Sequence, residues 1–205
     1  MTARRKMGQG TTACPVSIRK TGRLPGHSLG LLFLCALLLL NACGTTEKFS
    51  SEEHLKVVQV PFFPQETFQC GPAALATVIN YWYEKTGAAK TLGPQTIAAD
   101  IYSPSARGVL GMDLELYARK QGFQTRQLAG TIDELKGSLN EGAPPIVLVD
   151  YGFSSYQRNH FMVVKGYSDR ALLVNSGREE SKFIANEDLL KVWKKTGFWM
   201  LVVKP

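Results

Sequence analysis

The sequence predicts an α+β domain in which N-terminal helices are packed on a C-terminal antiparallel sheet. In the first half, apolar residues recur at helical spacing along one face, as Leu75, Val78, Ile79 and Trp82 do. In the second half, short β-rich runs are bounded by Gly, Asp, Asn and Pro, and the run Ser-Asp-Arg at 168–170 is a natural hairpin turn between two of them. Helices first and hairpin-linked strands afterwards are typical of this class.

Local sequence signals predict where the individual helices and strands begin and end. Pro72 suits the first turn of a helix, where its missing N–H has no partner to lose, and Thr131 with Glu134 fits a capping box. The predicted helices are Cys70 to Glu84, Pro94 to Tyr102, Gly111 to Lys120, Thr131 to Asn140 and Asn186 to Lys195. The predicted strands are Val57 to Pro61 at an edge, Pro145 to Asp150, Phe161 to Tyr167, Leu172 to Asn175 and Phe198 to Val203.

The first 42 residues have the pattern of an export signal. A basic stretch precedes an apolar run of about a dozen residues, which suits a signal-peptide core and is short for a bilayer span of about 20 residues. The ending Leu-Asn-Ala-Cys at 40–43 resembles the lipobox of bacterial lipoproteins. We therefore expect a lipoprotein signal peptide at 1–42, a polar tether at 43–56 and a folded domain at 57–205. An ordinary secretory signal and an uncleaved anchor are the alternatives, and Met7 is an alternative start.

In a lipoprotein, Cys43 would be the acylated N-terminus of the mature chain. Gly44 after it resembles the pattern of outer-membrane lipoproteins. The expected location is therefore the bacterial cell envelope, with the protein anchored by lipid to the outer membrane and facing the periplasm.

The net charge of +7 belongs mainly to the leader. Six basic residues precede position 24 and no acidic residue precedes Glu47, so 18 basic and 17 acidic residues remain after the first 23 positions. This balance argues against a nucleic-acid partner. No phosphate-binding glycine motif indicates a nucleotide, and no His, Cys or carboxylate cluster has metal-ligand spacing, so we expect no metal and no other cofactor.

Cys70 is the only cysteine that the predicted domain contains, because Cys14 and Cys35 lie in the signal and Cys43 would carry the lipid. A lone cysteine in an exported domain has no internal disulfide partner, so reactivity becomes a natural explanation. A helix start and a nearby imidazolium both favour the nucleophilic thiolate. A buried, inert cysteine is the alternative.

The remaining candidates stand at the ends of predicted strands or just before the helix. His160 is the one histidine of the domain and the candidate base, since His27 and His54 precede it in the signal and the tether. Asn175 is the candidate for orienting the imidazole, and Asp150 is a second candidate for that role. Gln65 is the candidate side-chain donor to an oxyanion, and Gln69 competes for that part.

Four segments together resemble the bacteriocin-processing, double-glycine cysteine peptidase domain, which is family 39 of the cysteine peptidases and papain-like. They are Val-Pro-Phe-Phe-Pro-Gln at 60–65, Gln-Cys-Gly-Pro-Ala-Ala-Leu at 69–75, Gly-Met-Asp-Leu at 111–114 and His-Phe-Met-Val-Val-Lys-Gly at 160–166. The resemblance implies a papain-like fold, with Cys70 as nucleophile, His160 as base and Gln65 in the oxyanion hole. Two features depart from the leader peptidases: Asn175-Ser176 replaces the usual Asp-Pro, and Gln65 stands one residue nearer the cysteine.

The leading hypothesis is a lipid-anchored envelope cysteine peptidase that hydrolyses peptide bonds through Cys70, His160 and an orienting Asn175. Its partners would be a peptide or protein substrate and the membrane through its lipid, with a separate export machinery as a further candidate. Because leader peptidases are normally fused to a transporter, the substrate need not be a bacteriocin precursor. The alternatives are a catalytically silent, peptidase-like module that binds peptides, and a thiol acyltransferase that uses the same residues.

Overall fold

The computed structural model describes residues 55–205. The expected signal peptide at 1–42, the lipidation site at Cys43 and most of the tether lie outside the described residues. Residues 55–205 all belong to one compact unit. The domain boundary expected at residue 57 stays a prediction.

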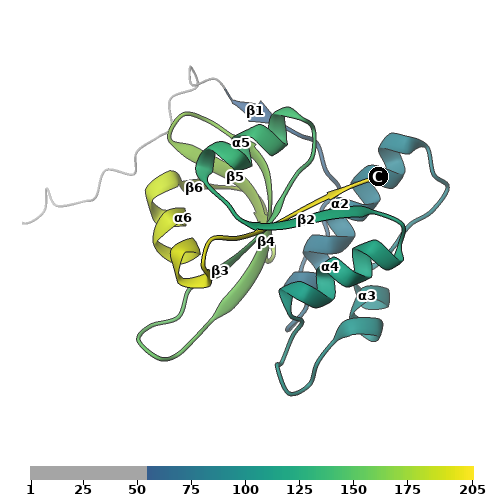
Figure 1. The fold of residues 1–205 in the computed structure, drawn as a ribbon, viewed down its shortest axis with the longest axis horizontal. Helices are drawn as coiled ribbons and strands as arrows, with labels where there is room; N and C mark the ends of the chain where they lie inside the picture. Colours follow the sequence, from purple (N-terminus) through teal and green to yellow (C-terminus); the bar gives the residue numbers. More distant parts are fainter. Residues whose placement is uncertain (1–54) are drawn as a thin grey trace, which may run out of the picture. The chain divides into compact units, whose positions relative to one another are not determined.

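A seven-stranded antiparallel sheet forms the centre of the domain (Figure 1). Its strand order is β2-β7-β3-β4-β5-β6, and β1 pairs with the far end of β4. The strands are β1 (Lys56–Val57), β2 (Gln124–Ala129), β3 (Ile146–Asp150), β4 (Asn159–Tyr167), β5 (Ala171–Ser176), β6 (Glu179–Ala185) and β7 (Trp199–Lys204). Strands β3, β4 and β5 therefore lie in the middle, where their apolar residues are covered on both faces.

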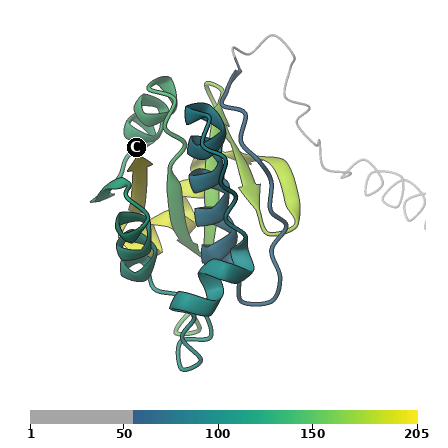
Figure 2. The ribbon, with the colours of Figure 1, turned by 90° about the vertical axis from the view of Figure 1, so that its right-hand side faces the viewer.

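The helices flank this sheet. They are α2 (Cys70–Thr86), α3 (Pro94–Ile101), α4 (Gly111–Lys120), α5 (Ile132–Asn140) and α6 (Asn186–Trp193), which a 3-10 turn at Lys194–Thr196 extends. Figure 1 shows α2, α3 and α4 grouped on one side of the sheet and α6 on the other, and Figure 2 shows α2 running along the sheet. Helix α2 is the most deeply buried of these, since every residue from Gly71 to Trp82 is buried.

The predicted fold class is confirmed, and most predicted elements occur within one or two residues of their expected bounds. Thr131 caps α5 as expected, because its Oγ1 accepts a hydrogen bond from the N–H of Glu134 at 3.1 Å. Two strands were not predicted. Residues 124–129 and 179–185 form the two edges of the sheet and are mostly exposed, so they lack the apolar runs that marked the inner strands.

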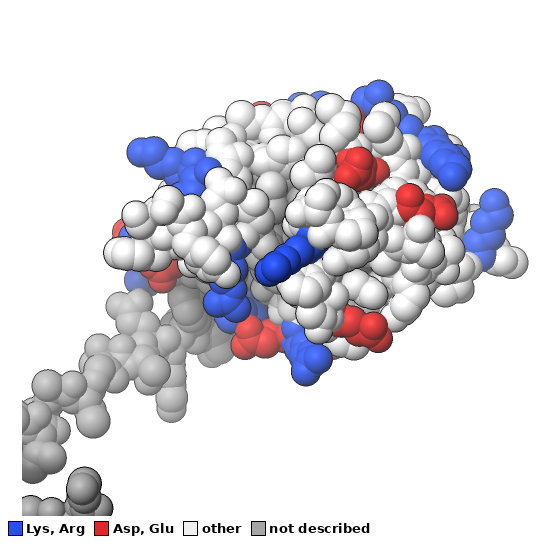
Figure 3. Space-filling view, turned by 90° about the horizontal axis from the view of Figure 1, so that it is seen from below, with Lys and Arg blue, Asp and Glu red and all other residues white. Residues whose placement is uncertain are grey.

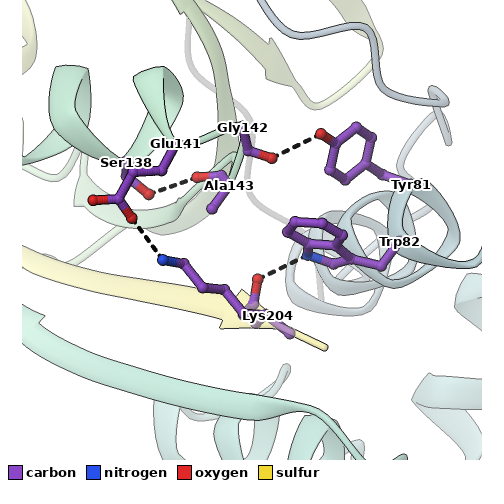
Figure 4. A network of polar contacts seen from close by, with 8 residues as sticks. Tyr81, Trp82, Ser138, Glu141, Gly142, Ala143 and Lys204 are labelled. Atoms are coloured by element: carbon purple, nitrogen blue, oxygen red, sulfur yellow. Dashed lines mark hydrogen bonds and ion pairs between the residues drawn. The ribbon is translucent and has the colours of Figure 1, made fainter. Parts of the chain in front are cut away.

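Polar contacts join the second half of α2 to the end of β7 and to the segment between α5 and β3 (Figure 4). Tyr81 donates its hydroxyl to the carbonyl of Gly142 at 2.7 Å, and Trp82 donates Nε1–H to the carbonyl of Val203 at 2.8 Å. Lys204, the last residue of β7, is ion-paired with Glu141 at 2.6 Å. These contacts fix the axis of α2 relative to β7, and thereby the position of its first turn.

Replacing Trp82 by Phe removes the buried donor and leaves the Val203 carbonyl without its partner. We expect the free energy of unfolding to fall by about 1–3 kcal/mol, which is the usual cost of an unpaired buried polar group. Urea denaturation followed by far-UV circular dichroism measures it. Tyr83→Phe is the matched control, because no hydrogen bond of the Tyr83 hydroxyl occurs in the described part of the chain. Equal midpoints for the two variants would contradict the assigned role of Trp82.

Candidate active site

Cys70 is the first residue of α2, and its side chain is only partly accessible. The segment before it turns sharply, with Phe68 at a φ of 62° and Gln69 at the N-cap position. The N–H groups at a helix start have no partner within the helix, so they point toward the space in front of the thiol. The sequence therefore places the thiol next to backbone donors that are not used within the helix.

Gly71 is required by packing. A Cβ on Gly71 would lie 2.3 Å from Cγ2 of Val109 and 3.2 Å from the ring of Phe161. The first turn of α2 is thus enclosed between β4 and the segment that leads into α4.

His160 lies at the start of β4 and makes one side-chain hydrogen bond. Its Nε2 is 3.0 Å from Oγ of Ser176, at the end of β5. The ring of Tyr151 lies beside the imidazole, with the ring centroids 6.1 Å apart. Within residues 55–205, no hydrogen bond joins the imidazole to the thiol of Cys70, although both side chains line the same cleft.

Asn175 does not contact the imidazole. It is buried, its Oδ1 accepts a hydrogen bond from the N–H of Ser181 at 3.1 Å, and its Nδ2 has no partner in the described part of the chain. Its cross-strand partner on β4 is Val163, so Met162 stands opposite Ser176. Because side chains alternate along a strand, Ser176 shares a face with His160 and Asn175 shares the other face with Val163.

A β-bulge between Val164 and Gly166 causes this arrangement. On the turn side of the bulge, Tyr167 pairs with Leu172 and Gly166 with Leu173. A regular hairpin would continue this register and set Asn175 opposite Val164, on the face of His160. The extra residue at the bulge shifts the register by one, and a shift of one residue moves every side chain to the other face.

Gln65 lies close to the imidazole. Its N–H donates to the carbonyl of Gly177 at 2.9 Å, which ties the segment before α2 to the turn after β5. A Cβ on Gly177 would lie 3.8 Å from Oε1 of Gln65 and 4.0 Å from Cε1 of His160, so both groups border this one residue. Oε1 of Gln65 and Oε1 of Gln69 are both buried without a hydrogen-bond partner among the described residues.

Asp150 holds a loop and does not contact the imidazole. Its Oδ1 accepts from the N–H groups of Gly152 and Arg158, each at 2.7 Å, and these close the β3–β4 connection. The two N–H donors lower the pKa of the carboxyl, that of Arg158 most. Asp150 therefore fixes the backbone of Arg158, which lies two residues before His160.

A cleft of about 960 Å³ brings these groups together. Its walls are the loop before α4, the β3–β4 loop, the segment before α2 and the start of β6. Figure 1 shows the first two of these loops at the lower end of the molecule. Cys70, His160, Gln65 and Ser176 all line this cleft, whereas Asn175 lines a smaller cavity of about 10 Å³ behind it, together with Gln65 and Cys70.

The electrostatics differ from the expected thiolate–imidazolium pair. Burial raises the pKa of the Cys70 thiol, and the backbone N–H groups of Phe161, Gly71 and Cys70 offset this only in part. Burial, followed by the charges of Arg158 and Lys182, lowers the pKa of His160 to about 4. The free site therefore holds a neutral thiol and a neutral imidazole at pH 7. The physical reason is that the imidazole meets a hydroxyl and two nearby cations, and no carboxylate contacts it in residues 55–205.

The chain belongs to the Peptidase_C39 like family, whose profile matches residues 57–199. This membership and the fold support a papain-like cysteine peptidase function. No curated protein matches the chain.

Solved structures share the fold at low sequence identity. A protein assigned as a C39-like peptidase from Bacillus anthracis has a TM-score of 0.61 at 16% identity, over 75% of this chain and 98% of that one. A double glycine motif protease from an AMS/PCAT transporter, solved in complex with its leader peptide, has a TM-score of 0.57 at 24% identity, over 73% and 94%. The peptidase domain of Streptococcus ComA, a bi-functional ABC transporter of a quorum-sensing pathway, has a TM-score of 0.55 at 22% identity, over 70% and 97%.

Two further features concern residues 55–205 alone. None of their helices has both the length and the apolar character needed to cross a bilayer. No three of their His, Cys, Asp or Glu side chains are grouped closely enough to hold a metal ion.

The lowered pKa of His160 predicts a pH dependence of stability. The folded-state pKa of about 4 lies below the ordinary value of 6.5, so protons bind the unfolded chain more readily. The free energy of unfolding is therefore expected to fall as the pH is lowered from 6.5 toward 4, with no contribution from this group above that window. Urea titrations at several pH values measure it.

His160→Gln should remove this slope, because Gln does not titrate. Asp150, whose pKa is lowered, supplies a separate loss of stability at more acidic pH in both chains. If the wild type and His160→Gln lost stability equally between pH 6.5 and 4.5, the buried neutral imidazole would be the wrong description.

Proposed function

We propose that this protein is a cysteine peptidase that hydrolyses peptide bonds with Cys70 as nucleophile and His160 as base. The observation that carries the proposal is that a cysteine at the buried start of α2 and a histidine at the start of β4 line one cleft. A peptide substrate is supported by the fold neighbour that was solved with a leader peptide.

Because both groups are neutral, the proton moves during the attack. As the sulfur of Cys70 bonds to the scissile carbonyl carbon, its proton passes to the imidazole of His160, in the manner of a serine–histidine pair. The carbonyl oxygen gains the negative charge. The N–H of Cys70 at the free start of α2 is one donor to it, and the side-chain amide of Gln65 is the second.

The imidazolium then returns its proton to the leaving amine, and the C–N bond breaks to give a thioester. Water attacks the thioester, with His160 again accepting a proton, and the carboxylic acid product leaves as the thiol re-forms. An amine in place of water would give acyl transfer, which only the products distinguish.

Ser176 is the positioning residue for His160 in this proposal. Its hydroxyl, 3.0 Å from Nε2, orients the ring, which is the task expected of Asn175 from the sequence. A hydroxyl can hold a ring orientation, but it does not stabilise the imidazolium as a carboxylate does. This predicts a slower base than a carboxylate-supported histidine.

The proposed setting is the bacterial envelope, with the mature chain attached through a lipid on Cys43 and facing the periplasm. The support is the sequence pattern at residues 29–44. Mass spectrometry of the membrane-extracted protein tests this directly, because cleavage before Cys43 and diacylglycerol addition change the mass of the N-terminal peptide.

The neutral thiol and imidazole favour one other function, a peptide-binding module without turnover. In that case the cleft would bind extended peptides, while the raised pKa of Cys70 and the lowered pKa of His160 would keep the site unreactive.

Cys70→Ala is expected to abolish peptide cleavage while the fold is kept, because Ala fits the space left by the thiol. The full chain in nonionic detergent is incubated with a mixture of synthetic peptides, and mass spectrometry detects new termini. Turnover that persists in Cys70→Ala would overturn the proposal.

Two glutamines provide a matched pair in the same assay. Gln65→Ala should lower kcat roughly 10²–10³-fold if its amide binds the oxyanion. Gln69→Ala makes the same truncation at the N-cap and should leave kcat within a few-fold. The reverse order would assign the oxyanion role to Gln69.

The neutral pair also predicts the pH profile of thiol alkylation in the full chain. Iodoacetamide should react with Cys70 at a rate that rises only at a pH above that at which an ordinary thiol ionises, since burial raises the pKa of this thiol. Ser176→Asp should move the profile to lower pH, because a carboxylate beside His160 favours the imidazolium and therefore the thiolate.

Ser176→Asn is the uncharged control and should leave the midpoint unchanged. The other cysteines of the chain are replaced by Ser in this experiment, so that one thiol is observed. A wild-type midpoint well below pH 8 would contradict the neutral pair and indicate a preformed ion pair.

A further inference from the structure

We propose that the cleft selects acidic peptides, with substrate carboxylates held by Arg107, Arg158, Arg178 and Lys182 on either side of the scissile bond. This inference rests on the proposed peptidase function and names the substrate class of the same site. It is carried by the charge distribution of the domain, by the ionic partners of these four side chains, and by their places around His160.

The positive charge of the domain is concentrated in the cleft. Residues 55–205 contain 17 basic and 14 acidic side chains, and four of the basic ones but only one acidic one, Glu179, line the cleft. The rest of the described part therefore has 13 of each sign. Figure 3 views the lower end of the molecule, where basic side chains lie across the centre and at the rim with acidic ones among them.

These cations are only partly neutralised. Lys182 is ion-paired with Glu179 at 2.5 Å, and Arg178 donates Nε–H to the carbonyl of Gln65 at 3.5 Å. No carboxylate in residues 55–205 pairs with the guanidinium of Arg107 or of Arg158. Both side chains are exposed, so they are free to form two-pronged hydrogen bonds with an incoming carboxylate.

The four cations come from three different walls of the cleft. Arg107 lies on the loop before α4, Arg158 at the end of the β3–β4 loop, and Arg178 and Lys182 on the turn and strand that follow β5. A peptide in the cleft would have cations on both sides of its backbone. We therefore expect carboxylates on both sides of the cleavage point to contribute.

The same charges act on the base. Arg158 and Lys182 lower the pKa of His160, so they lie near its ring. Ser176 and Tyr151 contact the ring, and the cleft that it lines also contains Cys70, Gln65, Arg107, Arg178 and Glu179. A substrate carboxylate paired with Arg158 would offset its charge and make the imidazole a better base when substrate is present.

Fluorescein-labelled 12-residue peptide mixtures test the inference as binding, which needs no turnover. Three mixtures differ only at four positions, which carry Asp/Glu, Asn/Gln or Lys. Full-length Cys70→Ala in nonionic detergent is titrated by fluorescence anisotropy. The acidic mixture should bind at least about tenfold more tightly than the Asn/Gln mixture, the ratio expected for one charge-assisted hydrogen bond. The ratio should shrink between 50 and 300 mM NaCl.

Substitutions that each remove one positive charge identify the residues that cause the preference for acidic peptides. Arg158→Gln and Arg107→Gln should each reduce the acidic preference several-fold, whereas Lys90→Gln, which removes an exposed cation outside the cleft, should not. Equal binding of acidic and Asn/Gln peptides overturns the inference. The inference is also overturned if inorganic tripolyphosphate, at the same concentration of negative charge, displaces the acidic peptide. That result would indicate a surface that binds any polyanion.

The wild-type chain separates this inference from the proposed function. If acidic peptides bind selectively and no Cys70-dependent cleavage of them occurs, the peptidase proposal fails and acidic recognition stands. If cleavage occurs at equal kcat/KM for acidic and Asn/Gln peptides, the peptidase proposal stands and acidic selection is wrong.

Discussion

Burial of the first turn of α2 is the constraint on which the site depends. The turn is enclosed by Val109 and Phe161 so closely that residue 71 has no room for a side chain. This packing points the start of the helix into the cleft and fixes the thiol beside β4. It also removes the thiol from water, which disfavours the charged form. The same burial therefore positions the thiol and makes it less reactive at rest.

The electrostatics around His160 follow from what the fold puts beside it. A buried imidazole resists protonation unless an anion compensates, and here its hydrogen-bond partner is a neutral hydroxyl. Arg158 and Lys182 add to the resistance, since both bring positive charge. Whatever favours the imidazolium during a reaction must then come from the substrate, from the forming oxyanion, or from both.

Much of the fold could be predicted from the sequence, because inner helices and strands bury apolar faces with a clear period. The edge strands 124–129 and 179–185 could not, because their residues are mostly exposed and polar. Cys70, His160 and Gln65 lie together as expected, since each stands at an element end that opens into one cleft. Ser176 was not predicted because its position depends on the bulge in β4. A bulge in a short apolar strand leaves no pattern in the sequence. The basic residues of the cleft were missed because they gather from separate loops.

The bulge explains why a hydroxyl, and not an amide, meets the imidazole. It inserts Lys165 into β4, and this buried lysine donates to Oγ of Ser181 and approaches Glu180. Ser181 in turn donates its N–H to Asn175, which holds that amide on the face opposite His160. Restoring an amide to the imidazole would therefore require the bulge to be lost and the ion pair of a buried lysine to be broken. The register of β5 is in this way fixed by contacts on the face of the sheet opposite His160. Because of this register, the side chain of β5 that reaches the imidazole is Ser176.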